Sequence, residues 1–250
     1  MDRNVRPLAG SLRGAGPALA AAVASVLLLG ACSSDSADDG DTGSDDAPAA
    51  QEPGAPEEVR YAELPNACET LGDDTVDAVV PEAGEEKELP SADVAATSAC
   101  IWSGLDGYDF RSLTVTLKRF DSDEALGGGD ARAETFLQAQ TAEISDDPAV
   151  EDVLESAPEG VGDQAVGLAF TSEKTSGESE REFRQQRMVV RTANAVVTVD
   201  YAGTGFEDAE LPSADAIEEG AERVASEVVA YLESQAADGG ADEDGDEGED

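Results

Sequence analysis

Three cysteines and a complete lack of histidine limit the chemistry available to this chain of 250 residues. Without imidazole there is no Ser-His-Asp or Cys-His nucleophile system and no histidine-ligated zinc site. A redox-active dithiol usually has the spacing Cys-x-x-Cys or a basic neighbour, and Cys68 and Cys100 have neither. The sequence therefore argues against catalysis by histidine or thiol groups.

The chain is strongly acidic, because 57 Asp and Glu residues against 15 Lys and Arg residues give a formal charge of −42. Binding to nucleic acid needs a basic surface, and so does attachment to anionic lipid through a polybasic segment. The acidic runs also lack the spacing of a calcium-binding loop, which has glycine at its sixth position and glutamate at its twelfth. We therefore expect no nucleic-acid partner, no metal site and no cofactor.

One group of basic residues stands out against this acidic background. Arg181, Arg187 and Arg191 have the same parity in a segment that is predicted to form a strand, so their side chains should project from one face. Guanidinium groups on one face could bind an anionic ligand or an acidic partner. Alternatively, the three residues only balance acidic residues on neighbouring strands, which is the interpretation we expect.

The first 32 residues have the features of an export signal. A basic region up to Arg13 precedes an almost wholly apolar segment, 18–29, which is too short for a membrane-spanning helix. It ends in Leu29-Gly30-Ala31-Cys32, which resembles the lipobox of bacterial lipoproteins. The resemblance implies cleavage before Cys32 and acylation of its thiol, so that lipid would hold the protein at the outer face of the cytoplasmic membrane. The alternative is an ordinary secretory signal in which this cysteine is incidental.

Composition divides the rest of the chain into three parts. Residues 32–59 are rich in Asp, Ser, Gly, Ala and Pro, and residues 236–250 contain no apolar side chain larger than alanine. Neither segment can bury enough surface to offset its ordering entropy, so both are predicted to be disordered. We therefore expect a signal peptide over 1–31, an acidic tether over 32–59, one folded domain over 60–235 and an acidic tail over 236–250.

Hydrophobic periodicity predicts three helices and about five strands in the folded domain. The helices are expected over 69–80, 131–144 and 213–232, and the strands over 100–102, 112–120, 165–170, 182–191 and 195–202. Asn194 is expected to accept a positive φ in the turn between the last two strands. The order α-β-β-α-β-β-β-α with short connections predicts an α+β fold, in which helices cover the apolar face of an antiparallel sheet.

Cys68 and Cys100 remain as an even pair once Cys32 is acylated. Outside the cytoplasm such a pair favours a structural disulfide, which would join the first helix to the first strand. Trp102 shares the strand parity of Cys100, so we expect it to pack against the bridge in the core rather than to stack on a ligand.

Several of these features together are similar to a known family. The segments Asn66-Ala67-Cys68, Cys100-Ile101-Trp102 and 160–165, with the sequence Gly-Val-Gly-Asp-Gln-Ala, resemble those of actinobacterial lipoproteins of the domain-of-unknown-function 3558 type. The similarity covers residues 65–232. That family has no established activity, so the resemblance implies an envelope lipoprotein with an α+β sheet domain and nothing catalytic.

The functional expectation is a lipid-anchored envelope domain that is not an enzyme and binds an unknown small ligand or a neighbouring protein. One alternative is a cell-wall hydrolase that uses paired carboxylates, although aromatic residues, which usually line a sugar cleft, make up only 4% of the chain. Another is a structural or sensory accessory whose acidic arms act as spacers. A deep concavity would favour ligand binding, and a close pair of carboxylates inside it would favour the hydrolase.

Overall fold

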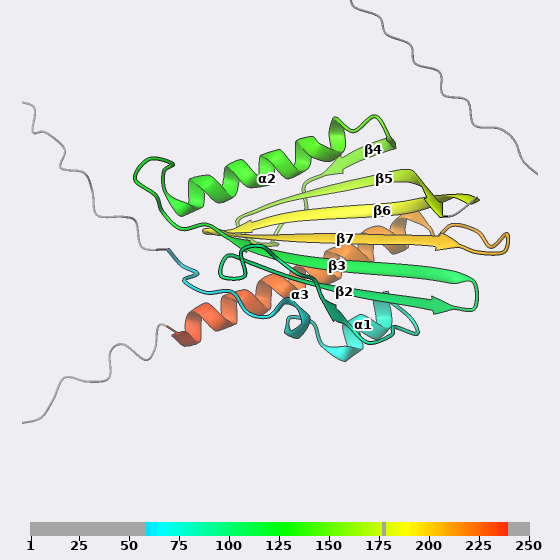
Figure 1. Ribbon diagram of the computed structural model, residues 1–250, viewed down its shortest axis with the longest axis horizontal. Coiled ribbons are helices and arrows are strands. Elements are labelled where there is room, and N and C mark those ends of the chain that lie inside the picture. Colours follow the sequence, from blue (N-terminus) through cyan, green and yellow to red (C-terminus); the bar gives the residue numbers. More distant parts are fainter. Residues whose placement is uncertain (1–58, 177–178, 240–250) are drawn as a thin grey trace, which may run out of the picture. The chain divides into compact units, whose positions relative to one another are not determined.

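The computed structural model describes residues 59–176 and 179–239 (Figure 1). The expected signal peptide, the lipobox Leu29-Gly30-Ala31, Cys32, the tether up to residue 58 and the tail beyond residue 239 lie outside the described residues. The last helix continues to Gly239, a few residues beyond the expected boundary at residue 235. No helix within the described ranges is both long enough and apolar enough to cross a membrane.

One antiparallel sheet of seven strands forms the centre of the described domain, in the spatial order β1-β2-β3-β7-β6-β5-β4. The strands are β1 (Lys87–Glu88), β2 (Thr97–Asp106), β3 (Asp109–Arg119), β4 (Val150–Ser156), β5 (Gln164–Ser176), β6 (Ser179–Thr192) and β7 (Ala195–Gly205). The helical elements are the 3-10 helix η1 (Ala67–Glu69), α1 (Asp73–Val79), α2 (Gly129–Ser145) and α3 (Ala214–Gly239). The α+β class and the antiparallel sheet are confirmed.

The main core lies between the sheet and α3, which runs behind the strands in Figure 1. The hydrophobic periodicity that predicts a helix over 213–232 corresponds to a stripe of residues buried in the core with the sheet: Ile217, Ala221, Val224, Ala225, Val228 and Leu232. From the sheet, β3 contributes alternate residues Leu113, Val115 and Leu117 to the same core. The apolar face of α3, which repeats every 3.6 residues, therefore packs in the same core as the apolar face of β3, which repeats every second residue.

The second long helix lies on the opposite face of the sheet, which corrects the expectation that all helices cover one face. Ala133 and Leu137 of α2 pack against Val189 of β6 and Val196 of β7. The adjacent residues Met188 and Val197 point the other way, into the main core under α3. The central strands are buried on both faces for this reason, and the continuous apolar run of β7 is the sequence sign of that burial.

Two edge strands were not predicted, so the expected number of about five strands is too low. The strand β1 has only two residues, both exposed and charged, and carries no apolar periodicity. In β4 the pairing register shifts between Glu151 and Leu154, and Asp152 has a φ of 53°. This bulge interrupts the alternation of side chains, so the segment does not read as a strand from its sequence.

The first predicted helix is divided into two short elements. Gly72 is the N-cap residue of α1 and offers no side chain to cap it. Glu227 of α3 takes that role, because its carboxylate accepts hydrogen bonds from the Gly72 backbone N–H at 2.7 Å and from the Thr75 hydroxyl. A residue far along the chain thus stabilises the start of this helix.

The turn between β6 and β7 differs from its prediction in one detail. The residue with positive φ is Ala193, at 47°, and not Asn194. Asn194 is buried, and its amide nitrogen donates hydrogen bonds to the backbone oxygens of Tyr61 and Phe120, while its Oδ1 accepts one from the Tyr61 N–H. Asn194 therefore joins the start of the domain to the sheet.

Candidate functional site

The three arginines predicted to share a face do not form a single binding site. At the usual rise of a strand, Arg181 lies about 20 Å from Arg187, and Arg187 about 13 Å from Arg191. The Nε of Arg187 donates a hydrogen bond of 2.6 Å to Oδ1 of Asp200, its direct cross-strand partner on β7. A second carboxylate, that of Glu143 on α2, lies 3.8 Å from its Nη1. Arg187 therefore balances charge between neighbouring elements.

The other two arginines also have partners within the domain. Arg181 donates a hydrogen bond of 2.6 Å to the Gly205 carbonyl and stacks over the Phe206 ring, with its Cζ 4.4 Å from the ring centroid. Arg191 lies 3.5 Å from the carboxylate of Asp163. Arg187 thus pairs with an acidic residue on a neighbouring strand, whereas Arg181 and Arg191 have other partners, and within the described residues the three guanidinium groups do not gather at one place.

The disulfide between Cys68 and Cys100 is present, with the two Cα atoms 5.1 Å apart. It joins η1 to β2, as the even pair of cysteines predicted. Trp102 lies with Cys100 in the main core and is 4% exposed, so it is a packing residue. Neither the disulfide nor Trp102 lines either of the two cavities described below.

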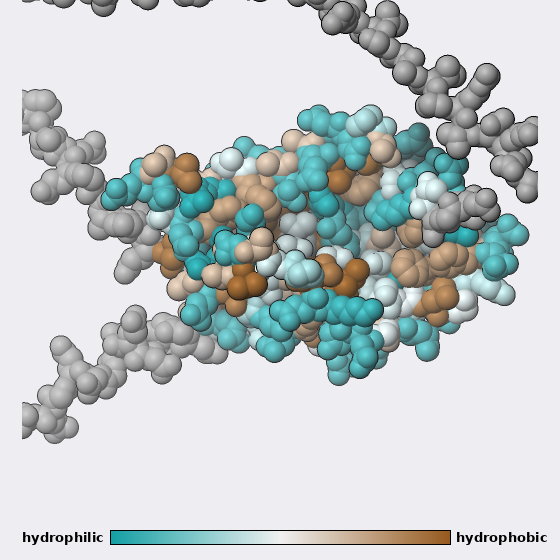
Figure 2. Space-filling view, in the orientation of Figure 1, coloured by the Kyte–Doolittle hydropathy of each residue, from teal (hydrophilic) through white to brown (hydrophobic). Residues whose placement is uncertain are grey.

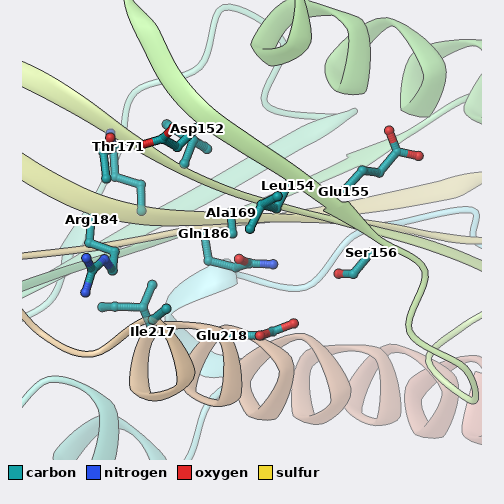
Figure 3. A pocket seen from close by; sticks show the side chains of 13 residues that line it. Asp152, Leu154, Glu155, Ser156, Ala169, Thr171, Arg184, Gln186, Ile217 and Glu218 are labelled. Carbon is teal, nitrogen blue, oxygen red and sulfur yellow. The ribbon is translucent and has the colours of Figure 1, made fainter.

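The feature with the geometry of a binding site is a cavity of about 420 Å³ between α3 and the β4–β5–β6 side of the sheet (Figure 3). Its volume is typical of small-molecule sites. Apolar side chains from three sides contribute to its lining: Leu154, Ala169 and Ile217. Leu154 is 70% exposed although it is a large apolar residue, because the bulge in β4 holds it at the cavity mouth. We call this space the α3 cavity.

The α3 cavity has one buried hydrogen-bonding group that lacks a full set of partners. Gln186 of β6 is 1% exposed, and its side chain extends over α3 between Ala169 and Ile217 (Figure 3). Within the described residues its Oε1 has no hydrogen-bond partner, and its Nε2 contacts the Met188 sulfur at 3.7 Å. A buried amide without partners is uncommon in folded proteins, because it loses its hydration without compensation.

Gly167 on β5 makes room for this amide. A Cβ at that position would lie 2.5 Å from Oγ of Ser156 and 2.8 Å from Nε2 of Gln186. Any larger residue would therefore displace one of the two polar side chains. The space beside Gln186 depends on a glycine in the middle of a strand, where glycine otherwise weakens a sheet.

The charged residues around the α3 cavity are mostly acidic. Asp152, Glu155 and Glu218 contribute to its lining, and Arg184 is the one basic residue there. The Nη1 of Arg184 donates a hydrogen bond to the Pro212 carbonyl. In Figure 3 the three carboxylates lie at separate points, and Glu155 is directed away from the cavity. They do not form the facing pair of a glycosidase.

A second hollow of about 470 Å³ lies beside the disulfide-bonded end of the sheet. It is formed by Leu64, Pro65, Leu89, Pro90 and Val94, together with neighbouring polar residues. The structure gives it no buried polar group without a partner.

Figure 2 shows apolar residues scattered over a face on which hydrophilic residues predominate. Among the residues that the structure describes, no group of three or more acidic or cysteine side chains is placed to hold a metal ion.

The sequence analysis did not identify Gln186, Leu154 or Gly167 as site residues. One signal was available for Gln186, because it has the strand parity of Met188 and Val190, which are buried under α3. A polar residue on an otherwise apolar strand face is the pattern of a buried polar group. Leu154 gives no such signal, since its placement depends on the bulge in β4.

Comparisons with known proteins give structural similarity but no family. No protein-family model matches the chain, and no curated protein matches it. The extracellular domain of PknH from Mycobacterium tuberculosis is 16% identical with a TM-score of 0.37, over 73% of this chain and 98% of that one. LpqN, involved in cell envelope biogenesis of the same organism, is 16% identical with a TM-score of 0.30, over 59% and 78%.

The lipid transfer and protein localization domain of human StarD13 is 10% identical with a TM-score of 0.26, over 60% of this chain and 88% of that one. All three TM-scores lie below 0.5, so no function follows from these similarities.

Proposed function

We propose that this chain is an exported lipoprotein, anchored in the membrane through lipid on Cys32, whose folded domain binds a small amphiphilic molecule without transforming it. The observation that carries the proposal is the α3 cavity, which combines exposed and buried apolar side chains with the buried, unpaired amide oxygen of Gln186. Binding sites for small molecules commonly combine an apolar lining with a few placed polar groups.

Two further features support export to the cell envelope. The first is the basic and apolar start of the sequence with its lipobox, Leu29-Gly30-Ala31-Cys32. The second is the disulfide between Cys68 and Cys100, a bond that persists in oxidising compartments and is rare in the cytosol. The separate positions of the three cavity carboxylates favour binding over hydrolysis.

Uptake of a neutral fluorescent dye tests the proposal. The mature chain, residues 32–250 with Cys32→Ser so that no acyl group is present, should bind Nile red with a saturable rise in fluorescence. Ala169→Leu places three more carbon atoms in the α3 cavity and should reduce the dye affinity at least fivefold. The control is Ala230→Leu, which adds the same group at an exposed position of α3 and should change nothing. An absent signal, or equal affinities for both variants, would overturn the proposal.

A further inference from the structure

Gln186 determines which hydrogen-bonding group a molecule in the α3 cavity must carry. Its Oε1 can only accept a hydrogen bond, and nothing within the described residues donates one to it. The hydroxyl of Ser156 also lies next to the space left by Gly167, but it forms no hydrogen bond with that oxygen. A molecule that places an O–H or N–H group there would supply the missing partner.

The charges around the cavity decide against an anionic group. Three of the lining residues are acidic, namely Asp152, Glu155 and Glu218. The one basic lining residue, Arg184, donates to the Pro212 carbonyl, and in Figure 3 its guanidinium group lies apart from the Gln186 amide. A carboxylate or phosphate next to Gln186 would therefore face an acceptor oxygen at a buried position, and it would lose its hydration beside an amide that carries no positive charge.

Burial decides against a cationic group at the same position. Gln186 is almost fully buried, so an ammonium group that reached its Oε1 would exchange its whole hydration shell for one neutral acceptor. The rim carboxylates do not converge on one position, because Figure 3 shows Asp152, Glu155 and Glu218 at separate points. An uncharged donor loses much less hydration on entering the cavity.

Apolar side chains form another part of the lining. Leu154 at the mouth, Ala169 on β5 and Ile217 on α3 surround the space in front of the amide. Burying an alkyl group against these side chains would remove the exposed surface of Leu154 from water. The polar and apolar parts of the cavity thus correspond to the two ends of an amphiphile.

We infer that the α3 cavity selects an uncharged amphiphile whose O–H or N–H group donates a hydrogen bond to Oε1 of Gln186. The inference rests on the proposed function, because it specifies the ligand class of the same cavity. Gln186 is then a specificity-determining residue, and Gly167 is the position that leaves space for its amide.

Four probes with ten carbon atoms test the inference by displacing Nile red from the mature chain with Cys32→Ser at pH 7. They are 1-decanol, its isomer nonyl methyl ether, decanoate and decylammonium. The alcohol and the ether have the same composition and differ in whether they can donate a hydrogen bond. We expect 1-decanol to displace the dye at a concentration at least fivefold lower than any of the other three.

Two glutamine variants assign the difference to the correct side chain. Gln186→Met keeps the length of the side chain and removes the acceptor, so the alcohol and the ether should become equal. The control is Gln138→Met on α2, since Gln138 is exposed, is not among the cavity-lining residues, and donates to Oε1 of Glu134 on a helix that packs against the other face of the sheet. This variant should keep the wild-type preference for the alcohol. Gln186→Met should also unfold at no lower a urea concentration than the wild type, because it removes a buried polar group that lacks a partner.

The outcomes separate failure of the inference from failure of the proposed function. Equal displacement by alcohol and ether in the wild type, strongest displacement by decanoate or decylammonium, or a preference that survives Gln186→Met would overturn the inference while dye binding stands. If the dye is not bound at all, the proposed function fails with it. The ranking of the four probes on the wild-type chain decides the matter even if Gln186→Met does not fold.

Discussion

Arg187 illustrates how single polar residues are used in this domain, because it is largely buried and pairs with acidic groups from two elements. Its Nε contacts Asp200 on β7, and its Nη1 lies near Glu143 on α2. Asn194 and Tyr201 also bind groups from distant parts of the chain, since each donates hydrogen bonds to backbone oxygens of segments far away in sequence. Gln186 differs from these residues because it lines the α3 cavity while its buried Oε1 has no hydrogen-bond partner among the described residues.

Arg187→Ala should lower the free energy of unfolding by about 1–3 kcal/mol, because it leaves Asp200 without its charge-assisted hydrogen bond. Urea denaturation of the mature chain measures this change. Arg223→Ala removes an exposed arginine from α3 and should cost less than about 0.5 kcal/mol. Binding of neutral probes should be the same in both variants. A loss of binding with unchanged stability would instead revive the anionic-ligand interpretation of Arg187.

Tyr201 should make stability depend on pH in the alkaline range. Burial raises the pKa of its hydroxyl above the usual value of 10.0, although nearby Arg111 opposes the shift. A group whose pKa is raised on folding contributes stability that is fully present below the unfolded pKa. That contribution is lost as the pH rises through the folded pKa.

The free energy of unfolding should therefore fall above about pH 10 in the wild type, from the unfolded pKa of tyrosine upward. Tyr201→Phe should make this fall shallower. The same variant should be less stable at pH 7 by about 1–2 kcal/mol, because the Val79 carbonyl loses its donor. Urea titrations at pH 7 and at several values above pH 9 measure both effects. An alkaline slope that is as steep in Tyr201→Phe as in the wild type would show that another group causes it.

Secondary-structure elements of this domain are stabilised largely by partners that lie far along the chain. The start of α1 is capped by Glu227 of α3, and η1 is attached to β2 by the disulfide. The bulged edge strand β4 contributes Leu154 and Ser156 to the α3 cavity only because it pairs with β5. Each of these elements is short or irregular, so tertiary contacts rather than local propensity determine it.

Removing the disulfide by replacing Cys68 and Cys100 with alanine should lower the free energy of unfolding by about 3–4 kcal/mol, the value expected for a closed loop of this length. The fold should persist, since the core between α3 and the sheet does not depend on the bridge. Urea denaturation of the oxidised wild type and the double variant gives the difference, and far-ultraviolet circular dichroism checks the fold. Equal stabilities, or reactive thiols in the exported wild-type protein, would contradict this account.

At the scale of the whole molecule, two helices on opposite faces give the sheet different roles on its two sides. The α2 side is closed by Ala133 and Leu137 packed on Val189 and Val196. The α3 side contains the main core and, toward β4, the α3 cavity. With a formal charge of −42, the chain offers no general attraction to anionic surfaces, so attachment to a membrane would depend on lipid.

Lipid attachment at Cys32 is a prediction that the sequence alone supports. In the producing cell, Cys32→Ser should abolish acylation and leave an uncut precursor, because the signal peptidase of lipoproteins acts before an acylated cysteine. Intact mass and the mapped N-terminus of the membrane fraction measure both effects. A wild-type N-terminus at another residue, or a Cys32 without acyl mass, would contradict the prediction.

The sequence by itself determined those parts of the fold that local patterns encode. The stripe from Ile217 to Leu232 predicted the buried face of α3, and the alternation in 112–120 predicted the buried face of β3, because one period identifies one element. The even pair Cys68 and Cys100 predicted the disulfide, because no other partner remains for either thiol once Cys32 is acylated.

Only the tertiary structure decided the placement of α2, the edge strands and the α3 cavity. A strand such as β7 that is apolar at every position is compatible with a helix on either face, so its sequence does not say where α2 packs. The α3 cavity depends on Leu154, Gly167, Gln186 and Ile217, which come from four elements and meet only through strand pairing and helix packing. Contacts between residues so far apart in sequence leave no periodic signal along the chain.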